Sequence, residues 1–233
     1  MKTKHVRAFA AFLGFAGACQ ADEISKAHYL PHIEPAAFHG TVDNPYFPLV
    51  PGTVKTFIKR HGVKTSQIVV EVTRHTRTVM GVACIVVHDM ETEAGRLIED
   101  TYDWYAQADD GTVWYFGEDT REFKPGGEID ISGAWEAGKD GAQPGIVMPA
   151  TPLDLMPYRQ EFLAGKAEDV GQIVSMNELV TVPAGSYTEV LKTKEWSMVE
   201  SGTEQKWYAK DVGVVREVGA ADEITELTAM SRK

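Results

Sequence analysis

The residues of this chain that could bind a small molecule are concentrated in two segments, 102–107 and 113–119. Both segments alternate aromatic side chains with polar ones, and the polar groups include carboxylates and tyrosine hydroxyls. Ligand pockets are typically built from apolar or aromatic walls with a few well-placed polar groups. The two segments therefore predict a binding surface, provided that they lie side by side in the fold.

The connection between the segments, Ala108-Asp109-Asp110-Gly111, predicts how they pair. This pattern is typical of a type I turn followed by a glycine in the left-handed conformation, which closes a β-hairpin. In the register set by that turn, Tyr105 lies opposite Tyr115. One pair further along, Trp104 lies opposite Phe116.

Alternation along the two strands divides their side chains between two faces of the hairpin. One face is expected to be core and collects Tyr102, Trp104, Ala106, Trp114 and Phe116. The other face is aromatic with polar tips and collects Asp103, Tyr105, Gln107, Tyr115 and Asp119. On this second face we predict a ligand-binding site formed by Asp103, Tyr105, Gln107 and Tyr115, together with Trp135 from the segment that follows.

Residues 120–157 are rich in glycine and proline but also carry Trp135 and the apolar run Ile146-Val147-Met148. Long connections without elements of their own are uncommon in compact domains, and a disordered linker has no use for such apolar groups. We expect an ordered loop folded over one mouth of the sheet, forming the rim of the pocket. In the alternative, Trp135 merely packs on Tyr105 and Tyr115, and no pocket exists.

Acidic residues at the open end of the hairpin indicate a second kind of site. Asp100, Glu118 and Asp119 are expected to converge there, with His88 on the neighbouring strand. Carboxylate oxygens are preferred by hard cations such as Ca²⁺, whereas a histidine ligand favours zinc. Calcium or zinc is therefore a candidate cofactor, and a solvated acidic rim is the alternative.

Paired carboxylates across a cleft could also perform acid–base catalysis on an extracellular sugar or ester. The candidates are Asp103 and Glu118, with Glu161 or Glu195. The sequence has no nucleophile elbow, phosphate-binding loop, dinucleotide fingerprint, CxxC pair or HExxH motif. A carboxylate-dependent hydrolase or lyase is thus an alternative to a binding protein, without an assigned catalytic residue.

The elements that must position these residues are β-strands, which we expect along the whole of residues 53–233. Successive segments rich in Val, Ile and Thr are separated by glycine-containing breaks. No window keeps a 3.6-residue apolar period over three turns, so helices should be short or absent. We predict an all-β domain, an antiparallel meander curled into an open barrel or half-barrel. A proline-rich arm over residues 22–52 precedes it.

Residues 1–21 have the features of an export signal. Lys2, Lys4 and Arg7 precede an apolar run over 8–18, and Ala16 and Ala18 form an A-x-A cleavage site. The formal charge of −11 excludes the basic footprint that nucleic acid or anionic lipid requires. We expect an exported protein, periplasmic or extracellular, whose partner is a small-molecule or lipid-like ligand.

Cys19 leaves three possibilities open. The run 16–19, Ala-Gly-Ala-Cys, resembles a bacterial lipobox, although Ala16 stands where that motif usually has Leu. Cys19 would then carry a lipid anchor, the only membrane contact that the sequence predicts. It could instead form a disulfide with Cys84 in an oxidising compartment, or be removed with the signal. Cys84 itself, within the apolar run 82–87, is expected to be a small buried hydrophobe.

Three stretches of the chain resemble a family of uncharacterised exported bacterial proteins. They are 42–49 (VDNPYFPL), 103–107 with 113–119 (DWYAQ and VWYFGED), and 135–138 with 140–146 (WEAG and DGAQPGI). The resemblance implies export and supplies no catalytic residues.

A second resemblance covers the closing strands. Residues 182–187 (VPAGSY) and 207–215 (WYAKDVGVV) are similar to the last strands of bacterial envelope proteins with a lipoprotein-carrier-like open barrel. Asp211 stands where that pattern more often has Gly. The resemblance implies the same open-barrel fold.

Overall fold

The computed structural model describes residues 29–152 and 156–233. The predicted export signal and Cys19 lie outside the described residues. Within the described ranges, no helix has both the length and the apolar character needed to cross a membrane.

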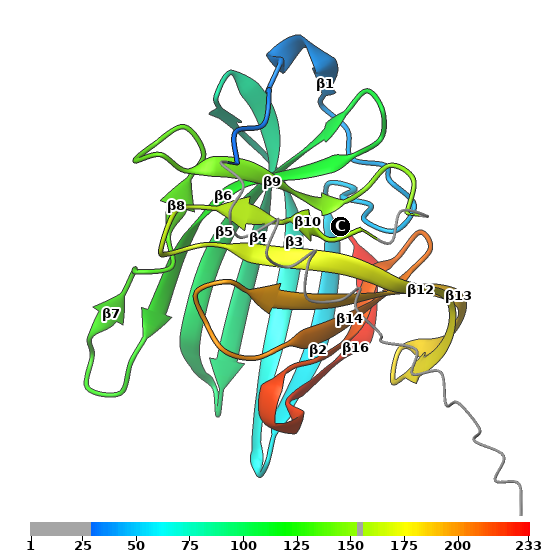
Figure 1. Cartoon of the computed structure of the whole chain (residues 1–233). Helices are drawn as coiled ribbons and strands as arrows, with labels where there is room; N and C mark the ends of the chain where they lie inside the picture. The colour runs from blue at the N-terminus through cyan, green and yellow to red at the C-terminus, as the bar shows by residue number, and fades with distance from the viewer. Residues whose placement is uncertain (1–28, 153–155) are drawn as a thin grey trace, which may run out of the picture.

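Antiparallel β-strands make up almost all of the described chain, which confirms the predicted all-β class (Figure 1). Two short 3-10 helices accompany them, η1 (Pro35–Ala37) and η2 (Ala220–Asp222). The strands of the first half are β1 (Phe38–His39), β2 (Thr53–His61), β3 (Lys64–Val79), β4 (Val82–Glu93), β5 (Arg96–Ala108), β6 (Val113–Phe123), β7 (Ile129–Asp130), β8 (Trp135–Glu136) and β9 (Gln143–Met148). Those of the second half are β10 (Tyr158–Arg159), β11 (Glu161–Phe162), β12 (Asp169–Val182), β13 (Gly185–Ser197), β14 (Glu204–Ala209), β15 (Gly213–Val218) and β16 (Ile224–Arg232).

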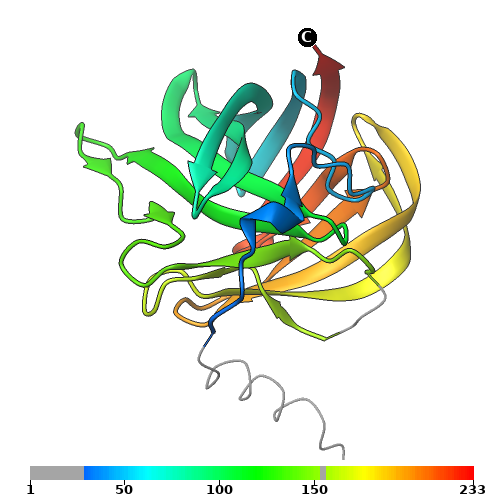
Figure 2. The same ribbon diagram turned by 90° about the horizontal axis from the view of Figure 1, so that it is seen from above.

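Two antiparallel meanders, β2–β6 and β12–β16, form the wall of the molecule. The last strand of the chain, β16, pairs with β2 and joins the two meanders along one edge. Seen from above, the sheet curls round on itself (Figure 2). On the other edge the order runs β6-β9-β11 and β10-β12, so a single seam lies between β10 and β11. The predicted open barrel is therefore confirmed.

The glycine- and proline-rich segment 120–157 contributes to this wall. Its strands β7, β8 and β9 all pair with β6, and β9 continues the sheet to β11. The sequence predicts a loop folded over a mouth of the sheet; three short strands of the segment lie in the sheet, and the residues between them form connecting loops. Gly145 explains part of the difference, because its missing side chain lets the backbone of Gln160 approach closely.

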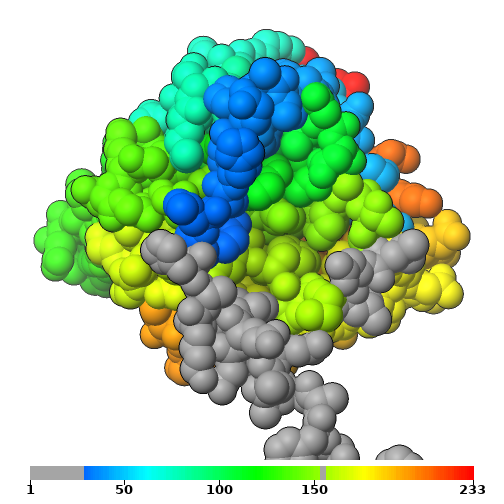
Figure 3. Space-filling model, turned by 45° about the horizontal axis from the view of Figure 1, so that its top comes forward, coloured from blue at the N-terminus to red at the C-terminus, as the bar shows by residue number. Residues whose placement is uncertain are grey.

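The proline-rich arm, described from residue 29 onward, packs against the barrel and does not extend into solvent. In Figure 3 it is the blue segment that lies across the surface of the molecule. Val42, Tyr46 and Leu49 are buried in the main apolar cluster, and β1 pairs with β5 at the hairpin turn. The arm is thus an integral part of the core.

The hairpin of β5 and β6 has the predicted turn. Gly111 has a φ of 94°, and the N–H of Ala108 donates to the carbonyl of Thr112 at 2.9 Å. Tyr105 lies opposite Tyr115, as predicted. The prediction for Trp104 is wrong, because Trp104 lies opposite Gly117 and not opposite Phe116.

A β-bulge at Gly117 causes this shift, and it exchanges the faces of the next two residues. Gly117 has a φ of 130°, and a side chain there would collide with the backbone of Trp135. Beyond the bulge, Glu118 lies opposite Asp103, and Asp119 lies opposite Tyr102. The predicted place of Asp119 on the Asp103 face is therefore wrong, since the extra residue turns Glu118 to that face instead.

Candidate functional site

The barrel contains two adjoining hollows, of which the first opens to solvent. The mouth chamber has a volume of about 540 Å³, and the inner chamber has a volume of about 330 Å³. Tyr105, Glu118, Val147, Gln160 and Lys206 line both, so the chambers share a wall or an opening. Their sizes are in the range of small-molecule pockets.

The predicted binding face of the hairpin lies at the junction of the chambers. Tyr105 and Tyr115 are stacked, with ring centroids 4.8 Å apart and planes 19° apart. The Tyr115 hydroxyl donates to Asp103 Oδ1 at 2.7 Å. Asp103 lines the inner chamber, Tyr115 the mouth chamber, and Tyr105 both.

Trp135 packs beside this face, because it lies opposite Glu118 in the sheet and therefore on the same side. Its ring meets that of Tyr115 edge-on at 5.3 Å between centroids, and only 5% of its surface is exposed. Trp135 does not line either chamber but borders a third hollow, which Glu118 and Asp119 also line. Trp135 thus packs on Tyr115, as one alternative predicts. The stacked tyrosines nevertheless line a cavity, as the other predicts.

Gln107 has a different environment from the other predicted binding residues. It is 4% exposed, and its side-chain oxygen accepts from the backbone N–H groups of Asp43 and Asn44 at 2.9 and 2.8 Å. Its amide group donates to Asp43 Oδ1 at 2.7 Å. Gln107 therefore clamps the arm to the barrel, and it lines neither chamber.

The arm closes one side of the inner chamber. Phe47 reaches into it, with its ring centroid 5.2 Å from that of Tyr105 and 6.5 Å from that of Tyr208. Pro48 and Leu49 line the same chamber. An apolar cluster that includes Phe57, Val190, Trp207 and Leu227 fills the neighbouring part of the barrel. The chambers are therefore an interruption in an otherwise packed interior.

The carboxyl groups of the chambers have unusual acidities. Burial, reinforced by the charges of Asp103 and Glu161, raises the pKa of Glu118 to about 9. Burial raises the pKa of Asp103 to about 6, although the hydrogen bond from Tyr115 opposes it. Burial and the charge of Asp169 raise the pKa of Glu161 to about 8. The cause in each case is that water is excluded from the charged form.

The inner chamber holds further groups of this kind. Burial raises the pKa of Asp89 to about 8, with repulsion from Asp103 adding to it. Burial raises the pKa of Glu217 to about 7, although the charge of Lys206 opposes it. Burial lowers the pKa of Lys55, which lines the same chamber, to about 8. Each of these groups costs free energy when it is charged in the empty protein.

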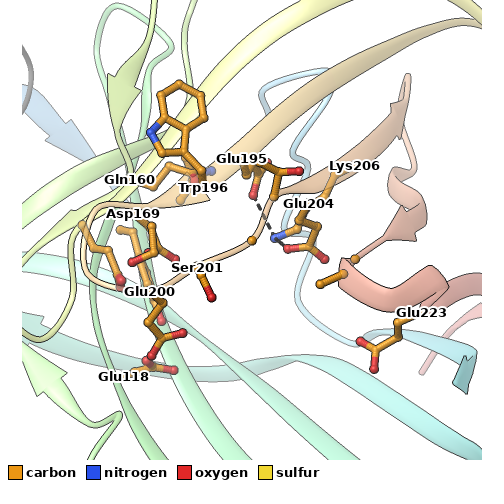
Figure 4. Close-up of a pocket in the computed structure, with 18 of the residues that line it drawn as sticks. Glu118, Gln160, Asp169, Glu195, Trp196, Glu200, Ser201, Glu204, Lys206 and Glu223 are labelled. Atoms are coloured by element: carbon orange, nitrogen blue, oxygen red, sulfur yellow. Dashed lines mark ion pairs between the residues drawn. The ribbon is translucent and has the colours of Figure 1, made fainter. Parts of the chain in front are cut away.

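The mouth chamber contains a network that the sequence did not reveal. Glu195, 6% exposed, pairs with Lys206 at 3.0 Å and accepts from Thr193 at 2.7 Å and from Tyr208 at 3.2 Å. Figure 4 marks the Glu195–Lys206 pair among the carboxylates around it. Besides Glu118, the acidic residues that line this chamber are Glu161, Asp169, Glu195, Glu200, Glu204 and Glu223.

Burial alone would raise the pKa of Glu195, but the ion pair and the hydrogen bonds outweigh it and hold the pKa below its usual value. The lysines nearest to Glu195 along the sequence, Lys192 and Lys194, are not its partners. The partner, Lys206, lies on the neighbouring strand β14. In this pairing Glu195 is opposite Glu204 and Lys194 is opposite Gln205. No local pattern could identify it.

The four predicted metal ligands do not all meet at one point. His88 Nε2 lies 2.6 Å from Asp100 Oδ1, and the imidazole stacks on Tyr102 at 4.1 Å between centroids, on the outer face of the sheet. Asp119 pairs with Arg121 at 3.0 Å on the same face, whereas Glu118 points to the interior. Among residues 29–152 and 156–233, no three His, Cys, Asp or Glu side chains are arranged to hold a metal ion.

Cys84 is fully buried, and burial raises the pKa of its thiol to about 12. The thiolate form, which is the reactive one, is therefore scarce at neutral pH. This environment agrees with the predicted structural role of Cys84.

No protein-family model and no curated protein matches the sequence. Two solved structures are similar to the chain. A protein described as exported, with a YmcC-like fold, from Bacteroides fragilis NCTC 9343 is 16% identical, with a TM-score of 0.47, and the match covers 80% of this chain and 99% of that one. A protein described as a lipoprotein, from Parabacteroides distasonis ATCC 8503, is 13% identical, with a TM-score of 0.44, and the match covers 81% of this chain and 99% of that one. At these values neither similarity bears on function.

Proposed function

We propose that this chain is an exported protein that binds a small molecule inside its barrel, at the junction of the two chambers. The observation that carries the proposal is the stacked pair Tyr105 and Tyr115 on the wall of a cavity, with Asp103 and Glu118 beside it. Aromatic walls with a few polar groups are typical of binding sites for small organic ligands. The signal-like residues 1–21 support export.

The lining favours a ligand that carries polar groups over a wholly apolar or lipid-like one. Carboxyl groups, hydroxyls and two lysines line the walls, and an apolar ligand would leave them without water or partners. The inner chamber also has an apolar wall, which includes Phe47, Phe57 and Val87 and would pack against the hydrocarbon part of a ligand that carries polar groups.

Native mass spectrometry of protein purified from its own cell envelope tests this proposal. We expect a retained organic molecule in the wild type and its loss from Tyr105→Ala. Should Tyr105→Ala fail to fold, Tyr105→Phe serves instead, because it removes only the hydroxyl. Wild-type protein that carries no molecule and binds none of a metabolite panel would contradict the proposal, since the chambers would then be empty packing defects.

One observation favours a second candidate function, a carboxylate-dependent hydrolase or lyase. Asp103 and Glu118 lie directly opposite each other in the sheet. Hydrogen bonding with the Tyr115 hydroxyl lowers the pKa of each carboxyl. With pKa values of about 6 and about 9, one carboxyl is ionised and the other protonated at neutral pH. An acid and a base side by side is the arrangement that acid–base catalysis needs.

The enzyme candidate is tested with a panel of neutral glycans and esters. Turnover that is lost in both Asp103→Asn and Glu118→Gln, but kept in Asp119→Asn on the outer face, would establish it. Binding without turnover across the panel leaves the binding function as the conclusion.

A further inference from the structure

The carboxyl groups of the two chambers have far too few cations to pair with. Of the described residues that line the chambers, Lys206 and Lys55 are the only lysines, and none is an arginine. Lys206 is already paired with Glu195 and Glu204. Asp89, Glu118 and Glu161 have no ion pair with any described residue. A buried charge without a partner is costly, and a positively charged ligand would provide one.

We propose that the ligand of this cavity is a small organic cation that carries two or more amine groups. This inference rests on the proposed function, because it assigns a chemical class to the ligand of the same site. The acidic groups are distributed over both chambers, so an elongated molecule with separated amines fits them better than a single point charge.

Two hydroxyl groups in the cavity independently indicate a ligand. Thr225 is only 6% exposed and lines the inner chamber, yet its hydroxyl has no hydrogen-bond partner among the described residues. The Tyr105 hydroxyl, which lines both chambers, also lacks a partner in the described part of the chain. Neither oxygen is among the fully buried polar atoms that lack a partner, so both are open to the chambers. These two are free to accept hydrogen bonds from the N–H groups of an amine.

An organic cation suits the site better than a metal ion. The described residues contain no group of three acidic, His or Cys side chains close enough to coordinate a metal, and a hard cation needs six or more oxygens within a small sphere. Ammonium groups need only one or two carboxylates each. The stacked rings of Tyr105 and Tyr115 additionally offer a cation–π surface.

Binding of such a cation should be coupled to the release of protons. The titratable and charged groups that face Glu118 from the chambers include Glu99, Asp103 and Tyr105 of β5, Tyr115 of β6, Glu161 of β11 and Lys206 of β14. Glu118 also borders the hollow lined by Arg77, Asp119, Glu136, Lys139, Asp140 and Lys166, in which Arg77 and Lys139 are paired with Glu136. A positive charge placed among them favours the ionised carboxylates. Affinity for an amine should therefore increase as the pH rises from 6 to 8.5.

Isothermal titration calorimetry with spermidine, a linear triamine, tests the inference on the full-length mature protein. We expect saturable binding that tightens with pH, weakens with salt and releases protons, as seen from titrations in two buffers of different ionisation enthalpy. Glu118→Gln should weaken binding about tenfold or more, because it removes a charge-assisted contact. Asp119→Asn is the matched control, since Asp119 is the next residue but lies on the outer face, and it should leave affinity unchanged.

The remaining probes separate failure of this inference from failure of the proposed function. Binding of neutral 1,8-octanediol with the same affinity as spermidine, or a neutral molecule retained in native mass spectra, would overturn the cation inference and keep the binding function. Equal weakening by Asp119→Asn would show surface attraction only and would also overturn it. Binding of Ca²⁺ or Zn²⁺ but not spermidine would assign a metal instead. A wild-type protein that binds no probe and retains no molecule would overturn both proposals.

Discussion

Tyr105 and Tyr115 are stacked neighbours, but their hydroxyl groups differ in hydrogen bonding. The Tyr115 hydroxyl donates to Asp103 at 2.7 Å, whereas that of Tyr105 has no partner in the described part of the chain. The first hydroxyl is therefore part of the structure of the site. The second is available to a ligand.

This contrast leads to a prediction about stability. Tyr115→Phe should lower the free energy of unfolding by about 1.5–3 kcal/mol, because it removes a hydrogen bond to a charged group. Tyr105→Phe should change it by less than about 0.5 kcal/mol. Urea denaturation at pH 8, where Asp103 is ionised, measures both. Equal losses in the two variants would mean that the Tyr105 hydroxyl has a partner in the protein.

At the scale of elements, the bulge at Gly117 decides which carboxylate faces the cavity. A regular strand would place Glu118 outside and Asp119 inside, as simple alternation predicts. Glycine at position 117 is the sequence signal for the bulge, but a strand glycine indicates only that the backbone is special there. Whether it marks a bulge depends on Trp135, whose backbone lies where a side chain at 117 would be.

Replacing Gly117 by alanine should therefore be severe. We expect a loss of at least about 3 kcal/mol, because the positive φ is strained for alanine and its Cβ collides with Trp135. Gly141→Ala is the matched control, since Gly141 has a φ of 86° but open space around it. It should lose only about 1–2 kcal/mol. Thermal or urea unfolding of the two variants gives the comparison, and equal losses would contradict the role of the collision.

The clamp between Gln107 and the arm is a second element-scale feature. Gln107→Ala should detach residues 42–49 from the barrel, because it removes three hydrogen bonds to Asp43 and Asn44. Hydrogen–deuterium exchange should rise in that segment, and Phe47 should no longer close the inner chamber. Gln67→Ala, at an exposed position of β3, is the control. Unchanged exchange in 42–49 would show that apolar contacts alone hold the arm.

At the scale of the whole molecule, the interior carboxyls should make the protein less stable as the pH rises. Each has a folded-state pKa above its unfolded value, namely about 6 for Asp103, 7 for Glu217, 8 for Asp89 and Glu161, and 9 for Glu118. Above about pH 4.5 the unfolded chain loses these protons first, so unfolding releases protons. The free energy of unfolding must then fall between pH 5 and pH 8.

Urea denaturation at half-unit intervals of pH measures this slope. Glu118→Gln should reduce the number of protons released on unfolding by about one, because a glutamine does not titrate. The free energy of unfolding should then fall less steeply with pH. Glu195 contributes to the pH dependence with the opposite sign, because its pKa is lowered in the folded state. Its contribution to the free energy of unfolding is lost only in acid. Lys55 has a folded-state pKa of about 8, below its unfolded value, so it begins to lose its proton near the top of this window and opposes the decline only there. A stability that increases from pH 5 to pH 8 would contradict the burial of these groups.

Much of this architecture was predictable from local patterns. Alternation and turn chemistry predicted an antiparallel open barrel, the Gly111 turn and the Tyr105–Tyr115 pair, because strand period and turn geometry depend on neighbouring residues. The same patterns identified Asp103, Glu118, Glu161 and Glu195 as acidic candidates, and all four line the chambers.

What these residues do together was decided by the tertiary structure. The partner of Glu195, the arm bound by Gln107, the placement of 143–148 in the wall and the reversal of Glu118 and Asp119 all depend on contacts between distant parts of the chain. The acidity of the cavity has the same origin. A sequence shows how many carboxylates a protein has, but only the folded barrel removes a subset of them from water and from their counter-charges. That removal changes their pKa values and their need for a ligand.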